Sequence, residues 1–184
     1  MNTFNLLVRA SFVFFICSIW TSSIAESISF LKAHCTRNTD RCASTHGKYL
    51  HSNSPENGGT SWGRKRSDIA WIVEYSPGEQ SVYLRAHCTS NRNNCSSTHG
   101  KYFHSNSPEG RGTSWGRKRS DIAWKIEYSK GPGVKNQIIY LKAHCTNNAV
   151  GCTSTHGKYL HSNSPEGGGT SWGIKRSDLA WIIE

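Results

Sequence analysis

The sequence predicts an all-β domain that is assembled from three copies of one unit. Residues 31–74 return as residues 84–127 and again as residues 141–184. Within each copy, apolar residues alternate with polar ones in short runs that turn-forming clusters separate. Each copy also carries two cysteines seven positions apart. Together these features predict twelve short strands, four in each copy, stapled by cystines.

The first 25 residues are typical of a signal peptide. Arg9 is the one charged side chain, an apolar run follows over residues 10–20, and small residues stand at Ser23 and Ala25. The secretory machinery reads this order, and the run is short for the alternative, a retained membrane anchor. We therefore expect a signal peptide at residues 1–25 and a secreted, extracellular mature chain over residues 26–184, with no stable membrane insertion.

The first copy shows where strands are expected. β-branched and aromatic residues recur over residues 28–34, 48–52, 61–64 and 70–74, and loops such as 53–59 separate them. With repeats at approximately 27–76, 80–129 and 137–184, twelve strands can close into a barrel capped by hairpins, which is a single β-trefoil. A three-bladed array and three separate small domains are the alternatives, and an open array needs dedicated capping units.

Comparison of the copies assigns faces to the strands. Ile72 is replaced by Lys125 in the second copy, so we expect this position to face solvent. The tryptophan beside it and the apolar residue after it are then expected in the core. The inward set comprises Trp71, Trp124 and Trp181 with Val73, Ile126 and Ile183, together with Leu31, Leu84, Leu141, Leu50, Phe103 and Leu160.

The cysteines of the mature chain are expected to form one disulfide in each repeat. Cys17 leaves with the signal peptide, so six remain, in the pairs Cys35 and Cys42, Cys88 and Cys95, and Cys145 and Cys152. An even count, a short spacing and an oxidising compartment favour these bridges. The alternative is a Cys₂His₂ zinc site, with His46 and His51 in the first copy, but the spacing departs from that of zinc fingers. We expect no metal and no cofactor.

Basic side chains recur at one place in every copy. The mature chain has 21 Lys and Arg residues against 12 Asp and Glu, a net charge of +9. The repeated basic segments are Arg64, Lys65 and Arg66; Arg117, Lys118 and Arg119; and Lys175 and Arg176. Such patches attract polyanions with a strong dependence on salt, so acidic glycans and anionic surfaces are candidate partners. A solvated basic turn is the structural alternative, and nucleic acid is not expected outside the cell.

Two family resemblances cover the whole mature chain. The stretches Gly-Lys-Tyr-Leu-His-Ser at 47–52 and Ser-Asp-Ile-Ala-Trp-Ile-Val-Glu at 67–74 resemble the MIR and fascin-type β-trefoil pattern. The same stretches resemble the repeats of mussel-type β-trefoil lectins, whose sugar sites use a His and an Asp. That resemblance implies site roles for His51, His104 and His161 and for Asp68, Asp121 and Asp178. The chain departs from the lectins after the His, where residues 52–55 read Ser-Asn-Ser-Pro instead of Pro-x-Gly-Gly. It also departs two residues beyond the Asp, where a second His is replaced by Ala70, Ala123 or Ala180.

A physical argument also supports sugar binding. A saccharide needs an aromatic face to stack on, an acceptor for its hydroxyl groups and a donor, all held on a rigid scaffold. The expected ligand-binding residues are His51, Asn53, Trp62 and Asp68, with His104, Asn106, Trp115 and Asp121, and with His161, Asn163, Trp172 and Asp178. The alternative is structural: the tryptophans pack across the cap of the trefoil, and each Asp caps a turn.

The sequence therefore predicts a secreted, multivalent, lectin-like protein with three equivalent sites, because triplication multiplies a binding site more naturally than a catalytic one. We expect a monomer without enzymatic activity that binds clustered or acidic glycans. The alternatives are a MIR-like module for an extracellular protein partner and a basic binder of acidic glycans or anionic surfaces. Actin bundling, which the fascin-type resemblance suggests, conflicts with the signal peptide.

Overall fold

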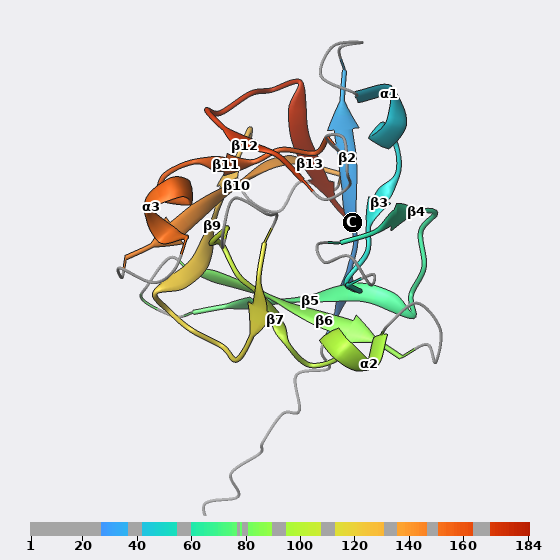
Figure 1. The fold of residues 1–184 in the computed structure, drawn as a ribbon. Helices are drawn as coiled ribbons and strands as arrows, with labels where there is room; N and C mark the ends of the chain where they lie inside the picture. The colour runs from blue at the N-terminus through green and yellow to red at the C-terminus, as the bar shows by residue number, and fades with distance from the viewer. Residues whose placement is uncertain are drawn as a thin grey trace, which may run out of the picture.

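A computed structural model describes residues 27–36, 42–54, 60–76, 78, 81–89, 95–107, 113–130, 136–146, 151–163 and 170–184. The predicted signal peptide lies outside these residues. Three short helices stand at the periphery at intervals around the centre, one for each repeat (Figure 1). None of the helices in the described part of the chain is long and apolar enough to cross a membrane.

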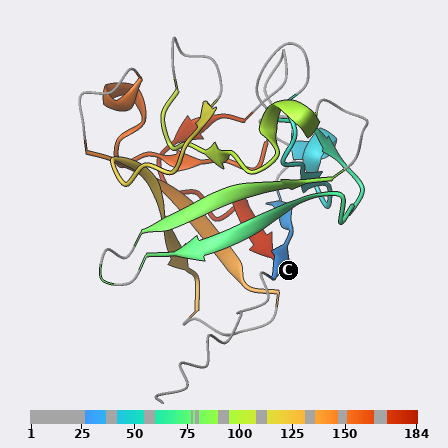
Figure 2. The same ribbon diagram turned by 90° about the horizontal axis from the view of Figure 1, so that it is seen from below.

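Six long strands form the barrel. They are β2 (Leu31–Cys35), β5 (Ile69–Tyr75), β6 (Val82–Cys88), β9 (Ile122–Tyr128), β10 (Ile138–Cys145) and β13 (Leu179–Ile183). The last strand of each repeat pairs antiparallel with the first strand of the next, as β5 with β6, β9 with β10, and β13 with β2. The turned view shows β5 and β6 running together along the barrel (Figure 2). The ring closes because β13 returns to β2 in the first repeat.

Three hairpins cap one end of this barrel. They are β3 (Tyr49–Leu50) with β4 (Trp62–Gly63), β7 (Tyr102–Phe103) with β8 (Trp115–Gly116), and β11 (Tyr159–Leu160) with β12 (Trp172–Gly173). The one-turn helices α1 (Cys42–Thr45), α2 (Cys95–Thr98) and α3 (Cys152–Thr155) each begin at the second cysteine of a repeat. A six-stranded barrel with three hairpins is a β-trefoil, which confirms the predicted fold.

The described chain contains thirteen strands rather than the expected twelve. The difference arises at Phe30, which separates β1 (Ile28–Ser29) from β2. β1 pairs with β5, whereas β2 pairs with β13, and the backbone of Phe30 exchanges hydrogen bonds of 2.9 and 3.1 Å with Glu184. The first strand of this repeat therefore changes its partner at Phe30.

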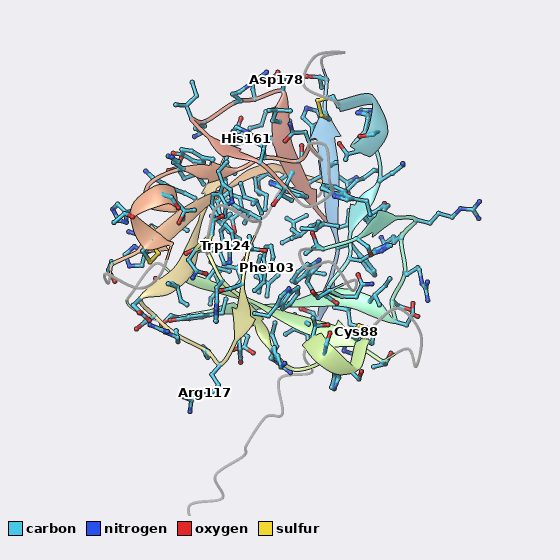
Figure 3. The ribbon with its side chains drawn as sticks, in the orientation of Figure 1. Cys88, Phe103, Arg117, Trp124, His161 and Asp178 are labelled. Carbon is cyan, nitrogen blue, oxygen red and sulfur yellow. A yellow bond between two sulfur atoms is a disulfide. The ribbon has the colours of Figure 1, made fainter. Side chains whose placement is uncertain are left out.

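The core has the three-fold composition that the sequence predicts. Trp71, Trp124 and Trp181 are fully buried, and each indole Nε1 donates to a backbone carbonyl at 2.7 to 2.9 Å. Phe103 and Trp124 lie at the centre of the molecule (Figure 3). The predicted leucines are 0 to 1% exposed, and Val73, Ile126 and Ile183 pack against this cluster.

The prediction that Ile72 faces solvent is wrong. Ile72 is 5% exposed, because it sits opposite Ile28 of β1 on one side and Arg85 of β6 on the other. Lys125 and Ile182 at the same position are half-buried. The lysine at this position in the second copy thus shows only that the second copy accepts a charge there, and it does not predict exposure in the other copies.

The predicted disulfides are confirmed. Cys35 bonds to Cys42, Cys88 to Cys95, and Cys145 to Cys152, with Cα atoms 5.2, 5.1 and 5.4 Å apart. The zinc alternative is therefore wrong, since it needs both sulfurs of a pair as thiolates. Each disulfide packs against the first residue of a barrel strand from the preceding repeat, Leu179, Ile69 and Ile122 in turn.

Candidate functional site

A hydrogen-bond chain joins the predicted His and Asn of each copy. Nε2 of His51 donates to the carbonyl of Arg64 at 2.9 Å, and Nδ1 lies 3.1 Å from Oγ of Ser61. Ser61 in turn donates to Oδ1 of Asn53 at 2.6 Å. The other copies repeat these contacts around His104 and His161. His51 is 7% exposed and Asn53 is 3% exposed, so this chain fixes the two ends of the loop that follows β3.

Burial changes the acid–base behaviour of these histidines. Desolvation lowers the pKa of His51, and the charge of Arg66 lowers it further, against the opposing effects of the Arg64 carbonyl and Asp68. His104 responds in the same way to its own surroundings. Burial therefore disfavours the charged form of these two imidazoles, which serve as hydrogen-bonding struts.

The predicted Asp of each copy forms a bidentate ion pair with the Arg two residues earlier. Nε of Arg66 lies 3.0 Å from Oδ1 of Asp68, and the terminal nitrogen lies 2.5 Å from Oδ2. Arg119 and Asp121 repeat the pair, as do Arg176 and Asp178. The Asp side chains are 33, 22 and 12% exposed and their Arg partners 39, 46 and 29%, so each pair reaches solvent, the third through Arg176 because Asp178 is buried. This fork-to-fork geometry orients both charged groups at the surface.

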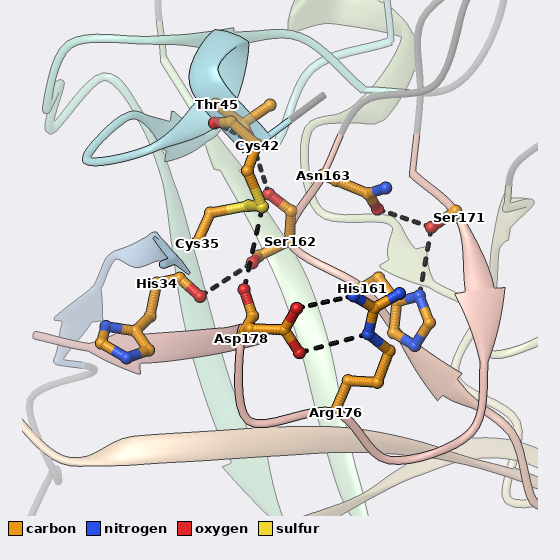
Figure 4. The surroundings of a disulfide bond; sticks show 10 residues. All are labelled: His34, Cys35, Cys42, Thr45, His161, Ser162, Asn163, Ser171, Arg176 and Asp178. Carbon is orange, nitrogen blue, oxygen red and sulfur yellow. Dashed lines mark hydrogen bonds and ion pairs between the residues drawn. A yellow bond between two sulfur atoms is a disulfide. The ribbon is translucent and has the colours of Figure 1, made fainter. Parts of the chain in front are cut away.

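The Arg–Asp pairs lie where two repeats meet (Figure 4). The carbonyl of Asp178 accepts a hydrogen bond from the backbone of Thr36 at 3.2 Å and lies 3.8 Å from Sγ of Cys42 in the disulfide. Thr45 of α1 donates to the carbonyl of Ser162 at 2.8 Å. The disulfide of the first repeat and the Arg–Asp pair of the third are thus held together by backbone groups.

The predicted tryptophans pack inward from the hairpins. Trp62 stacks on Trp181 with ring centroids 5.6 Å apart and planes 8° apart. Trp115 and Trp172 stack in the same way on the core tryptophans of the preceding repeats. The structure therefore brings His51, Asn53 and Asp68 into one neighbourhood but directs Trp62 to the barrel core. Whether any of them binds a ligand remains a prediction.

The lysine of each basic segment belongs to a cluster that the sequence did not reveal. Nζ of Lys118 lies 2.7 Å from Glu74 of the preceding repeat and 4.4 Å from the ring centroid of Tyr83. Glu74 also accepts from Nε of Arg85 at 2.7 Å and from the hydroxyl of Tyr102 at 3.0 Å. Equivalent clusters surround Lys65 with Glu184 and Lys175 with Glu127. These lysines tie neighbouring repeats together.

Only the first arginine of a basic segment extends away from the protein surface. Arg117 points outward at the edge of the molecule (Figure 3). Arg64 is likewise exposed, and its backbone carbonyl, not its guanidinium, is the partner of His51. In the third copy Ile174 takes this place and is 80% exposed. The third repeat therefore lacks the exposed arginine that the first two repeats have at this position.

Comparisons with known proteins find similar structures but no similar sequence. No protein-family model matches the chain, and no curated protein is significantly similar to it in sequence. These sequence comparisons therefore do not confirm the resemblance to MIR and fascin-type repeats, which remains a prediction.

Among solved structures, the chain is similar to a mosquitocidal holotoxin, with 14% identity and a TM-score of 0.52 over 88% of this chain. It spans 17% of the length of that toxin. It is also similar to SeviL bound to an asialo-GM1 saccharide (13% identity, TM-score 0.47, 85% of this chain and 95% of SeviL). A BEL β-trefoil in an apo crystal form gives 15% identity and a TM-score of 0.49, over 87% of this chain and 94% of BEL. Barrel, caps and repeat order together identify the chain as a β-trefoil protein.

Proposed function

We propose that this protein is a secreted, multivalent carbohydrate-binding protein with three equivalent sites. One observation carries the proposal: an Arg–Asp pair that reaches solvent recurs at the same position in all three repeats. The carboxylate accepts hydrogen bonds from sugar hydroxyls and the guanidinium donates them, the pattern that polar recognition of a saccharide requires.

The rigid surroundings of each pair support this role. The His–Ser–Asn chain fixes the neighbouring loop, and a disulfide lies beneath the backbone of each Asp, as Cys42 does for Asp178. Preorganised groups lose little conformational entropy when a ligand binds. Three weak sites on one body then gain avidity against a clustered glycan.

Binding without catalysis and export from the cell are parts of the same proposal. Both ring nitrogens of His51 are held by internal partners, which suits a scaffold better than a proton shuttle. Disulfides persist in oxidising compartments, so three of them support a secreted chain.

A glycan array at low and at physiological salt tests the proposal. The decisive variant changes Asp68, Asp121 and Asp178 together to Asn, which keeps their shape and removes their charge. The matched control changes the adjacent exposed serines, Ser67, Ser120 and Ser177, to Ala. We expect salt-resistant binding to neutral glycans that the Asn variant loses by at least about tenfold and the Ala variant keeps. Unchanged binding by the Asn variant would refute the assignment.

The same array separates the second candidate, recognition of acidic glycans by Arg64 and Arg117. Both side chains are exposed, and no acidic residue described in the structure pairs with either guanidinium, which favours this candidate. Binding restricted to sulfated or carboxylated glycans and lost at physiological salt would assign the function to these arginines.

A further inference from the structure

A surface cavity lies between the second repeat and its two neighbours in the described part of the chain. It has a volume of about 410 Å³ and lies between the hairpin of β5 and β6 and the adjoining strands β9 and β10. Its lining residues are Tyr75, Ser76, Ser81, Val82, Lys125, Ile126, Glu127, Tyr128 and Lys142. The Arg–Asp pairs described above do not contribute to it. The cavity is therefore separate from the three proposed sites.

Two lysines meet in this cavity. Lys125 of β9 and Lys142 of β10 are direct cross-strand partners. At the same register the other two junctions pair an isoleucine with a basic residue, Ile72 with Arg85 and Ile182 with Lys32. Like charges directly opposite each other in a sheet repel and destabilise it. A bound anion would remove that repulsion, and only this junction offers such a place.

Existing ion pairs leave Lys125 available. Nζ of Lys142 lies 3.5 Å from Glu127, which also binds Lys175 at 2.8 Å and the hydroxyl of Tyr159 at 2.9 Å. These three contacts offset much of the negative charge of Glu127, so that Glu127 repels an incoming anion only weakly. Among the described residues, no carboxylate forms an ion pair with Lys125. The positive charge of Lys125 faces the cavity without that compensation.

An aromatic wall completes the cavity. Tyr75 is 59% exposed, unusual for a large aromatic side chain, and its hydroxyl lies 3.3 Å from that of Tyr128. Such an exposed, fixed ring suits stacking against the apolar face of a sugar, and the two hydroxyls can bond to its polar edge.

We propose that this cavity binds one acidic saccharide residue, with its carboxylate or sulfate on Lys125 and Lys142 and its ring against Tyr75. This site goes beyond the three proposed sites and does not depend on them. The cavity binds an anionic ligand, whereas the ligand of the three Arg–Asp sites need not be charged. Each chain has one such cavity site and therefore binds one anionic ligand there.

Calorimetric and NMR titrations of the mature, oxidised protein test the proposal. The probes are N-acetylneuraminic acid for a carboxylate, N-acetylglucosamine 6-sulfate for a sulfate, and neutral N-acetylglucosamine. We expect one acidic probe to bind with one-to-one stoichiometry and the neutral sugar to bind at least about tenfold more weakly, the value of a charge-assisted hydrogen bond. Equal binding of neutral and acidic sugars, or no binding of either acidic probe at about 10 mM, would overturn the proposal.

Lys125→Ile is the decisive variant, because isoleucine stands at this position in the other two repeats. It should bind the acidic probe at least about tenfold more weakly while its melting temperature stays unchanged or rises. Tyr75→Ser should weaken binding of the sugar but not of inorganic sulfate. The charge-matched control is Lys101→Ala, an exposed lysine that does not line the cavity. Equal losses in Lys101→Ala and Lys125→Ile would refute a specific site.

The triple Asp→Asn variant distinguishes this proposal from the proposed function. It should lose binding at the three Arg–Asp pairs and keep the single anionic site. If the triple variant lost binding of the acidic probe while the Lys125→Ile variant kept it, the anion would bind at the Arg–Asp pairs and not in the cavity.

Discussion

Gly63 lies so close to the imidazole of His51 that a Cβ atom at residue 63 would stand 2.7 Å from Cε1 of the ring. The same distance recurs between Gly116 and His104 and between Gly173 and His161. Both ring nitrogens of His51 are hydrogen-bonded, so the ring cannot turn away without losing these bonds. The glycine of each repeated Trp-Gly pair therefore lies directly against the buried histidine of the same copy.

Gly63→Ala should destabilise the protein by about 1 to 3 kcal/mol, the range for overpacking of a filled site. Chemical denaturation measures this change in the free energy of unfolding. The double variant Gly63→Ala with His51→Ala provides the control, because the clash disappears with the ring. We expect the glycine substitution to cost clearly less in the His51→Ala background. Additive effects of the two substitutions would contradict the assigned contact.

Stability should fall as the pH drops from about 6.5 toward 5. Burial lowers the pKa of His51 and His104, and burial followed by the charge of His46 lowers the pKa of His34. The unfolded chain then binds protons at a higher pH than the folded chain, so acid favours unfolding below the unfolded histidine pKa of about 6.5. Above that pH these histidines are neutral in both states and contribute no pH dependence.

Thermal unfolding at pH 7.5, 6.5, 5.5 and 5.0 checks this expectation. Replacement of His51 and His104 by Gln keeps a polar side chain and removes the titration, so the slope between pH 6.5 and 5 should become shallower. The carboxylates act in a separate range: hydrogen bonds from its basic neighbours hold the pKa of Glu74 below its usual value despite burial, and its contribution is lost only as pH falls below about 4.5. An unchanged slope in the Gln variant would exclude His51 and His104 as its source.

The sequence was sufficient for the features that each copy determines by itself. Triplication, the cystine loops and the buried Leu31 and Trp71 follow from short-range spacing and alternation. Contacts between copies could not be read in this way, because pairing of Lys118 with Glu74 or packing of Trp62 on Trp181 depends on how the repeats close. The burial of Ile72 was missed for the same reason, since β1 covers it from a distant part of the chain.

Trp62→Ala should cost about 3 kcal/mol, because it removes an indole stacked on the core Trp181. Trp62→Phe keeps an aromatic ring over Trp181 and should cost clearly less. If packing is the role of Trp62, the folded Phe variant keeps the glycan binding of the parent protein on the same array. A Phe variant of parental stability that has lost glycan binding would instead make the indole part of a ligand site.

Removal of one disulfide by changing Cys88 and Cys95 together to Ser should cost about 2.5 kcal/mol, the loop-closure value for a ring of this size. Denaturation of the oxidised variant against the oxidised parent measures it. The equivalent change at Cys35 and Cys42 serves as an internal comparison, because its loop has the same length. Very different costs for the two loops would show that packing against Ile69 or Leu179, rather than chain entropy, dominates.

Changing Glu74, Glu127 and Glu184 together to Gln should both weaken the fold and expose basic charge. Each carboxylate accepts from a lysine of the next repeat at 2.7 or 2.8 Å, and its neutral replacement leaves that lysine without an ion pair there. We expect a loss of roughly 1 to 2 kcal/mol for each site, as for a hydrogen bond to a charged group. Because Lys65, Lys118 and Lys175 gain freedom, the folded variant should elute from a heparin column at higher salt than the parent. Elution at the parental salt concentration would show that these lysines remain held by the tyrosine rings even without the carboxylates.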